Sequence, residues 1–79
     1  MQINLKYFVY LKDEAGVSNE KIETDAKNIE ELFEQLNSKY KFSINKSYLR
    51  AAKNEEYVNF DTLLTDGDTI VFIPPVAGG

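Results

Sequence analysis

The residues best placed to do chemistry lie at the carboxyl end, because the chain offers few reactive side chains. Its 79 residues include no Cys and no His, which excludes thiol nucleophiles, disulfides and the commonest acid–base side chain at neutral pH. The sequence closes instead on a Gly-Gly pair, Gly78 and Gly79. We therefore expect the working group to be the carboxylate of Gly79, presented to another protein.

The six closing residues suit a tail that carries this carboxylate away from a folded domain. Pro74 and Pro75 lack a backbone N–H, so we expect the sheet to stop before them and the chain to leave it stiff and extended. Stretched at about 3.3 Å per residue, such a tail spans roughly 20 Å, enough to enter a partner's active site. Glycines have no Cβ and can thread a narrow channel. The predicted tail-threading residues are Pro74, Pro75, Val76, Ala77 and Gly78, and Gly79 is the predicted reacting residue.

A frayed end of small residues is the alternative interpretation of this tail. With Gly at about 7% of residues, two closing glycines arise by chance in roughly one chain in 200. Here the pair coincides with a rigid Pro-Pro spacer and with the absence of another reactive group. We therefore favour a functional tail.

The first part of the chain predicts two strands. From Ile3 to Leu11 the odd positions are mostly apolar, the period-two pattern of a strand with one buried face. Asp13 to Asn19, which contains a glycine, is predicted to be a loop. Glu20 to Asp25 is predicted to be a short and mostly polar second strand.

A helix over about 29–40 is the strongest prediction in the sequence, because five apolar residues form one stripe at helical spacing. Asn28 is the expected N-cap, and Glu31 stands three residues later in a variant of the capping box. The acidic side chains of the helix are expected to form a solvated face. The stripe consists of Ile29, Leu32, Phe33, Leu36 and Tyr40.

The second half of the chain predicts three more strands. Residues 48–53 and 56–60 form two of them, joined by a turn at 54–55, and Leu63 and Leu64 are expected to pack against the core. Thr69 to Ile73 is a continuous apolar run, which is typical of a central strand covered on both faces. Asp66 and Asp68 suggest a calcium loop, but other ligand positions are missing and turn chemistry is favoured.

This order of elements, with a single helix to cover one face of a sheet, predicts an α+β domain of the ubiquitin-like β-grasp type. We expect a mixed sheet of about four to five strands with one main helix packed on it. The first and last strands should lie parallel, side by side. The predicted domain spans residues 1–79, of which 74–79 form an extended, flexible tail.

The closing segment carries a specific family resemblance. Pro74 to Gly79, preceded by Leu64 to Phe72, resembles the end of molybdopterin synthase small subunits, a ubiquitin-like sulfur-carrier family. The resemblance extends over essentially the whole chain and includes Ala51 to Asn54. Lys53 departs from it, because the family more often has Val there. This departure affects strand packing and leaves the role of the tail intact.

The resemblance implies a chemistry in which Gly79 stores sulfur. An E1-like adenylating enzyme would use ATP to activate the Gly79 carboxylate, and a sulfur donor would convert the adenylate to a thiocarboxylate. The tail would then enter the large subunit of molybdopterin synthase and deliver sulfur to a cyclic pyranopterin phosphate, forming the molybdopterin dithiolene. On this interpretation the chain is a non-catalytic, sulfur-donating subunit of a heterotetramer of two small and two large subunits. It binds no cofactor or metal itself.

Docking to the large subunit implies an apolar patch outside the core. In the family, positions matching Phe8, Tyr57 and Ile73 contact the large subunit, and these three are the predicted partner-binding residues. Ordinary exposed aromatic residues are the alternative, since single apolar residues are common on protein surfaces.

The composition limits the classes of partner that the chain is expected to bind and its expected location in the cell. Thirteen acidic and nine basic residues give a net charge of −4, without the Lys/Arg cluster that would track a phosphate backbone. Nucleic acid is therefore not an expected partner. The first residues lack the pattern of a signal peptide, and no apolar run approaches the roughly 20 residues of a membrane span. We expect a soluble, cytoplasmic protein that does not bind membranes.

Two other functions compete with a molybdopterin synthase subunit. The sulfur carrier of thiamine synthesis shares the fold and the Gly-Gly end, but is typically shorter and lacks the Pro-Pro-Val spacer. A ubiquitin-like modifier would join Gly79 to a target lysine through an isopeptide bond. The Pro-Pro tail favours the synthase family, and higher-mass conjugates in cell extracts would favour the modifier.

Overall fold

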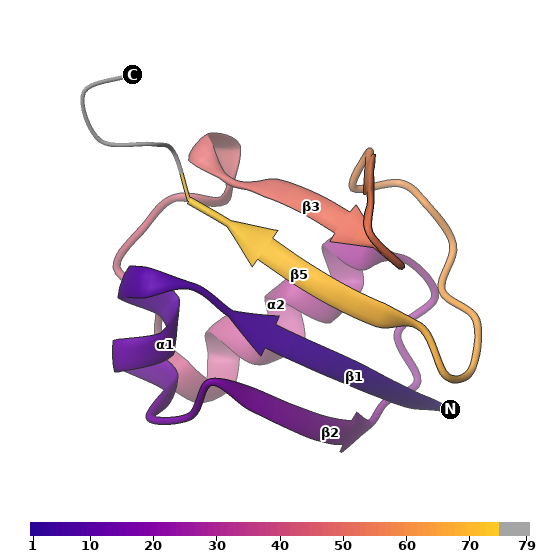
Figure 1. Ribbon diagram of the computed structural model, residues 1–79, viewed down its shortest axis with the longest axis horizontal. Helices are drawn as coiled ribbons and strands as arrows, with labels where there is room; N and C mark the ends of the chain where they lie inside the picture. Colours follow the sequence, from indigo (N-terminus) through magenta and orange to yellow (C-terminus); the bar gives the residue numbers. More distant parts are fainter. Residues whose placement is uncertain (75–79) are drawn as a thin grey trace.

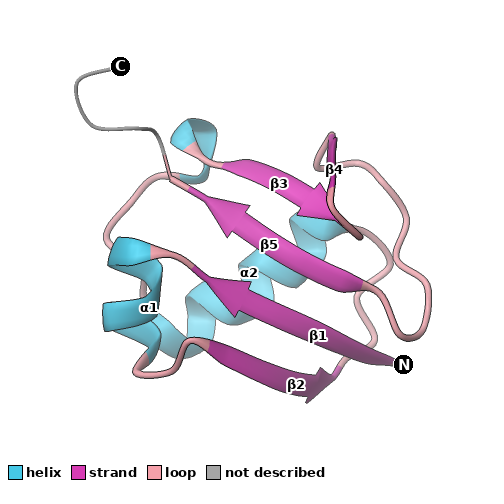
Figure 2. Cartoon of the chain, viewed as in Figure 1, coloured by secondary structure: helices cyan, strands magenta, loops and turns pink. Residues whose placement is uncertain are grey.

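A computed structural model describes residues 1–74, which form a five-stranded mixed sheet with one long helix across one face (Figure 1). Figure 2 shows the sheet in front and this helix behind it. The elements, in chain order, are β1 Gln2–Tyr7, α1 Val9–Ala15, β2 Asn19–Glu23, α2 Ile29–Tyr40, the short 3₁₀ helix η1 Lys46–Tyr48, β3 Arg50–Lys53, β4 Glu56–Val58 and β5 Thr69–Ile73.

The sheet has the strand order β2-β1-β5-β3-β4, so the last strand lies in the middle. β1 and β5 are parallel and in register from the pair Asn4 and Thr69 to the pair Tyr7 and Phe72. The other neighbouring pairs are antiparallel. The α+β, ubiquitin-like β-grasp fold is confirmed, as are the parallel first and last strands and the central position of β5.

The helix α2 has the predicted bounds and the predicted cap. Asn28 has an extended backbone, and its side chain accepts the Glu31 N–H at 2.9 Å. The Glu31 carboxylate reaches back to the Lys27 N–H at 3.0 Å, one residue before the position that a standard capping box uses. The apolar stripe of α2 packs on the sheet and buries Ile29, Leu32, Phe33 and Leu36.

The core lies between α2 and the sheet, and aromatic rings fill its centre. The ring of Phe33 lies 5.2 Å from that of Phe72 and 5.9 Å from that of Phe42. Alternate residues of β1 and β5 point into the same layer, including Ile3, Leu5, Ile70 and Phe72, all at most 1% exposed. Full burial of such side chains contributes roughly 1.5–3 kcal/mol each, so this layer is the main source of stability.

The prediction of one strand over Ile3 to Leu11 was wrong beyond Tyr7. The chain turns there into the seven-residue helix α1, in which the Leu11 N–H donates to the Phe8 carbonyl at 3.0 Å. Gly16 ends α1 with a left-handed φ of 80°. Leu11 is fully buried, as predicted, but it reaches the core from a helix. Three apolar residues at 9–11 fit a strand end and a short helix equally well, because only tertiary contacts distinguish the two.

The boundaries of β3 and β4 also differ from the predicted ones. Residues 46–48 form a 3₁₀ turn in which Asn45 accepts the Ser47 N–H, so β3 begins at Arg50 and not at 48. β4 ends at Val58, two residues early. The predicted turn at Asn54 and Glu55 is confirmed, and both residues have positive φ angles of 51° and 75°.

The prediction that β5 is covered on both faces was wrong. Ile70 and Phe72 face α2 and are fully buried, but Val71 and Ile73 are only half-buried on the opposite face. A single long helix covers only one face of the sheet. The apolar residues of β5 on the other face therefore remain open to a partner.

The turn between the last two strands uses its aspartates as predicted. Asp68 accepts the Thr65 N–H at 2.7 Å and the Asn54 amide at 3.0 Å, while Asp66 accepts the Gln2 N–H at 2.6 Å. Gly67 has a φ of 89° that favours glycine. This network holds the turn against the start of β1. In residues 1–74, neither helix has the length and apolar character needed to cross a bilayer.

Candidate functional site

The root of the predicted tail is fixed at the centre of the sheet. β5 ends at Ile73, and the buried Pro74 is the last residue described. On one side Tyr7 pairs with Phe72, and on the other Arg50 pairs with Ile73. The predicted tail residues Pro75, Val76, Ala77, Gly78 and Gly79 lie outside the described residues.

Packing beneath β5 makes this root rigid. Phe72 is fully buried, with its ring 5.2 Å from that of Phe33 and 6.0 Å from that of Phe60. Two neighbouring strands also supply backbone hydrogen bonds to β5. The point at which the chain leaves the sheet is therefore defined by a buried ring and by two strand ladders.

The structure brings the three predicted partner-binding residues together. Phe8, Tyr57 and Ile73 line one open hollow of about 250 Å³ on the sheet face opposite α2. Phe8 is 48% exposed and Tyr57 is 63% exposed, and they come from opposite halves of the chain. We call this surface the docking patch. It consists of Phe8, Ala52, Tyr57, Val71 and Ile73, with Glu55 at its rim.

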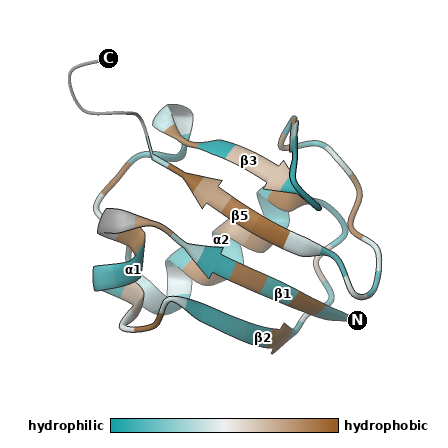
Figure 3. Cartoon of the chain, viewed as in Figure 1, coloured by the Kyte–Doolittle hydropathy of each residue, from teal (hydrophilic) through white to brown (hydrophobic). Residues whose placement is uncertain are grey.

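Strand register explains how the docking patch forms. Ala52 pairs with Val71 on one side and with Tyr57 on the other, so these three side chains form a row across β5, β3 and β4. Phe8 follows directly after β1, next to the strand that carries Ile73. Figure 3 shows the contrast along the sheet, where β5 is hydrophobic over most of its length and β2 is mostly hydrophilic. The patch therefore adjoins the root of the tail.

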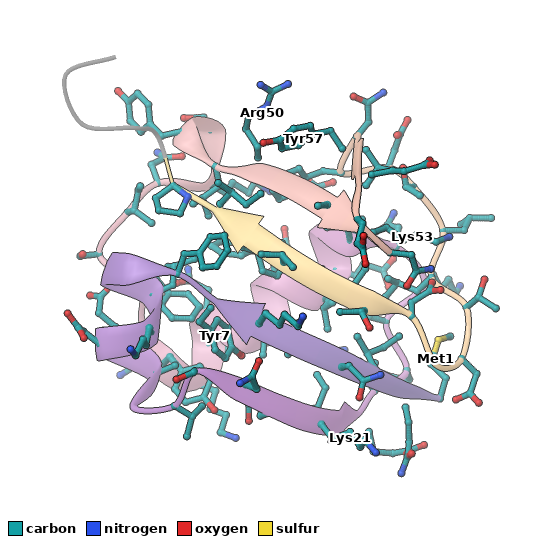
Figure 4. All side chains as sticks on the ribbon, in the orientation of Figure 1. Met1, Tyr7, Lys21, Arg50, Lys53 and Tyr57 are labelled. Atoms are coloured by element: carbon teal, nitrogen blue, oxygen red, sulfur yellow. The ribbon has the colours of Figure 1, made fainter. Side chains whose placement is uncertain are left out.

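Positive charge flanks the docking patch. Arg50 lies over the Tyr57 ring, with its guanidinium carbon 4.6 Å from the ring centroid, and Figure 4 shows the two side chains next to each other beyond β3. Lys6 is exposed and pairs in register with Val71 from the β1 side. Cations at this distance are attracted to the electron-rich face of an aromatic ring. Arg50 thus holds Tyr57 at the edge of the patch.

A tyrosine–carboxylate cluster supports the end of β1. Tyr7 and Tyr40 each donate to the same Glu20 oxygen at 2.6 Å, and their rings meet edge to face at 6.1 Å. Burial raises the pKa of the Tyr7 hydroxyl far above its usual range, and the hydrogen bond to Glu20 raises it further. The Tyr7 hydroxyl therefore remains a protonated donor. The cluster joins β1, β2 and α2 immediately before Phe8.

Lys53, the position at which the chain differs from the family it resembles, has a local partner in the turn before β5. Its ammonium lies 3.5 Å from Asp68 and donates to the Leu63 carbonyl at 3.1 Å. Burial acts to raise the pKa of Asp68, but the hydrogen bonds from Thr65 and Asn54, together with Lys53, outweigh it and lower that pKa. Lys53 therefore stabilises the turn and lies outside the docking patch.

Comparison with known proteins identifies the family. Residues 5–79 match the ThiS family, a match that includes the Gly-Gly end. The chain belongs to this family.

Relatives of this ThiS-family chain carry a specific name. It is 30% identical over 80 residues to the molybdopterin synthase sulfur carrier subunit of Escherichia coli K12, covering 98% of this chain and 99% of the relative. Its structure matches that of a Helicobacter pylori protein in a complex of subunits 1 and 2 of molybdopterin-converting factor. That match has a TM-score of 0.72 and 30% identity, and it covers both chains completely.

The same fold also occurs in a protein named as a modifier. The small archaeal modifier protein 1 from Methanosarcina acetivorans matches with a TM-score of 0.80 over 99% of this chain and 96% of that one. At 22% identity, this likeness shows the fold alone. The β-grasp fold of ThiS-family chains therefore does not separate sulfur carriers from modifiers.

Sequence reasoning missed part of the site in this ThiS-family chain. Ala52 and Val71 line the docking patch, although neither was predicted there. Period-two alternation within 69–73 would have placed Val71 on the same face as Ile73. Arg50 and the cluster around Glu20 were also missed, because both depend on pairing between distant strands.

Proposed function

We propose that this chain is the sulfur carrier subunit of a molybdopterin synthase and that the Gly79 carboxyl group carries the sulfur. The main support is the full-length relationship to proteins named as sulfur carrier subunits, through a family match that reaches Gly79. The patch of exposed apolar residues beside the root of the tail adds support, because a carrier must dock before its end can enter a partner.

Activation would take place on an E1-like adenylating enzyme. A Gly79 carboxylate oxygen attacks the α-phosphorus of ATP, which releases pyrophosphate and leaves an acyl-adenylate. A sulfide-level nucleophile from the sulfur donor then attacks the acyl carbon and expels AMP, which gives the thiocarboxylate. Adenylate is the leaving group, and the adenylating enzyme supplies the side chains for this step.

Sulfur transfer would take place on the large subunit of the synthase. The terminal sulfur attacks a carbon of the cyclic pyranopterin phosphate and displaces an oxygen bonded to that carbon, which leaves as water or as the phosphate oxygen of the opened cyclic ester. Water then cleaves the acyl–sulfur bond. Sulfur stays on the pterin and the Gly79 carboxylate is restored. Two carriers in turn supply the two sulfurs of the dithiolene, as expected of an assembly of two small and two large subunits. The docking patch brings the tail root to the partner, which holds the acid–base and phosphate-binding groups.

Intact-mass spectrometry of the native protein tests this proposal. We expect part of the protein to carry an oxygen-to-sulfur mass increment that fragmentation places on Gly79. Chemically prepared thiocarboxylate, mixed with the large subunit and the pterin, should yield molybdopterin. Sulfur on another residue would contradict the proposal, and a ladder of lysine conjugates would favour a modifier.

Deletion of Gly79 distinguishes the role of the tail in activity from any role in folding. We expect synthase activity to be lost while thermal unfolding of the domain hardly changes, since the deletion removes a terminal residue without a side chain and leaves every residue of the core in place. Unfolding of the truncated chain would show that the tail has a structural role.

A further inference from the structure

Arg50 occupies an unusual position at the edge of the docking patch. It is exposed, it begins β3, and it pairs in register with Ile73 at the root of the tail. Its guanidinium stacks on Tyr57, which is 63% exposed and lines the patch. None of the ion pairs formed within residues 1–74 involves Arg50. An arginine held in place on a tyrosine is therefore exposed, and no carboxylate among residues 1–74 occupies its donors.

A partner that covers the docking patch must also cover this guanidinium. Removing water from a charged group costs several kcal/mol unless the partner supplies hydrogen-bond acceptors in its place. The planar fork of Arg matches a carboxylate in bidentate geometry, and its stacking on Tyr57 means that little side-chain freedom remains to be lost. Among the acceptors available in proteins, a carboxylate offsets the desolvation of Arg50 best.

The charge distribution over the described residues favours the same partner chemistry. The sheet face that carries the patch presents three exposed cations, Lys6, Lys21 and Arg50, in a chain whose net charge is −4. Its carboxylates are Glu23, paired with the N-terminal ammonium at 3.1 Å, and Glu55 in the turn at the other end of β3. The exposed side of α2 carries Glu30, Glu31 and Glu34, of which Glu30 and Glu34 pair with Lys46 at 2.6 and 3.4 Å. Within residues 1–74 no carboxylate forms an ion pair with Lys6, Lys21 or Arg50, so an acidic surface on the partner would attract the patch face.

We infer that Arg50, stacked on Tyr57, is a specificity-determining contact that receives an Asp or Glu carboxylate of the synthase large subunit. Lys6, on the other side of Val71, adds longer-range attraction to the same acidic surface. This inference rests on the proposed function, because it names the chemistry of the surface that meets the docking patch. Tyrosine and arginine are, with tryptophan, the residue types enriched among energetically dominant interface contacts.

Charge-reversal variants of the full chain test this inference against the purified large subunit. Arg50→Glu changes the net charge by −2, and Lys27→Glu makes the same change at an exposed site beside Leu64, away from the docking patch. Arg50→Ala removes the contact, and Arg50→Lys keeps the charge without the planar fork. Dissociation constants would be measured at low and at physiological salt, with thermal unfolding of each free variant as the check on folding.

We expect Arg50→Glu to weaken binding by about 30-fold or more, the scale of an interfacial charge pair that loses one member. Arg50→Lys should recover only part of this loss. Lys27→Glu should stay within about threefold at physiological salt, where exposed charges are screened. The Arg50 variants should unfold at nearly the wild-type temperature, because the residue is exposed. Replacing the partner carboxylate by Arg should restore affinity for Arg50→Glu selectively.

The outcomes separate this inference from the proposed function. Equal binding by Arg50→Glu and Lys27→Glu, with wild-type protein still bound, overturns the inference and leaves the proposed function standing. Loss of binding by Arg50→Ala that no Asp or Glu substitution on the partner reproduces also overturns the carboxylate assignment. A wild-type chain that fails to bind the large subunit at all overturns both.

Discussion

Replacing Phe8 by alanine separates docking from folding. Phe8 is 48% exposed, and a phenylalanine side chain contributes roughly 200 Å² of surface, so about 100 Å² remains for a partner to cover. At ~25 cal/mol per Å² this area corresponds to about 2.5 kcal/mol. Reorganisation at the interface reduces such values, so we expect a loss of 1–3 kcal/mol in binding to the large subunit, or roughly 5- to 150-fold in Kd.

The stability of the free domain should change much less. The Phe8 side chain makes no capping hydrogen bond to α1, and Phe8 is not part of the buried core cluster that contains Leu11. We expect Phe8→Ala to cost below about 1 kcal/mol in unfolding free energy, against about 2–5 kcal/mol for Leu11→Ala. Leu63→Ala provides a matched control, because Leu63 is 68% exposed and lies outside the docking patch.

Calorimetric titration with the large subunit and thermal unfolding of the free chain measure the two effects. Normal affinity of Phe8→Ala, combined with a loss of stability as large as that of Leu11→Ala, would refute the reasoning. Phe8 would then be a folding residue and the docking surface would lie elsewhere. A loss of affinity by Leu63→Ala equal to that of Phe8→Ala would refute it in another way, since binding would then depend on any exposed apolar residue.

Two further predictions address the tail and the turn before β5. Gly78→Val should slow both ATP–pyrophosphate exchange with the activating enzyme and molybdopterin formation from prepared thiocarboxylate. The reason is that a β-branched residue adds bulk and loses the positive-φ conformations open to glycine. Normal rates in both assays would exclude a narrow channel. The lowered pKa of Asp68 predicts a stability contribution that is present above its ordinary pKa of 3.8 and is lost as pH falls through the folded value. Asp68→Asn should therefore reduce stability at pH 7 and flatten the loss of stability below pH 5 in thermal unfolding, whereas an unchanged acid limb would show that Asp68 is not its source.

Much of the architecture follows from local pattern. The stripe of α2 and its cap at Asn28 depend on residues within one or two helical turns, so their bounds were predicted correctly. The turn at Asn54 and Glu55 likewise needs only local positive-φ backbone. The local pattern was weakest in the segment after Tyr7. There the short helix α1 depends on burial of Leu11 against distant residues.

The proposed chemistry of the tail rests on sequence alone, because it needs only residue types in order: a chain without Cys or His, a Pro-Pro spacer, and the end Gly78 and Gly79. The proposed docking surface needed the tertiary structure. Phe8 and Tyr57 meet only because β1 and β5 pair in parallel and β3 and β4 pack beside them. Whether an apolar side chain of the sheet is buried or exposed depends on which face the single long helix covers. No local pattern contains that information.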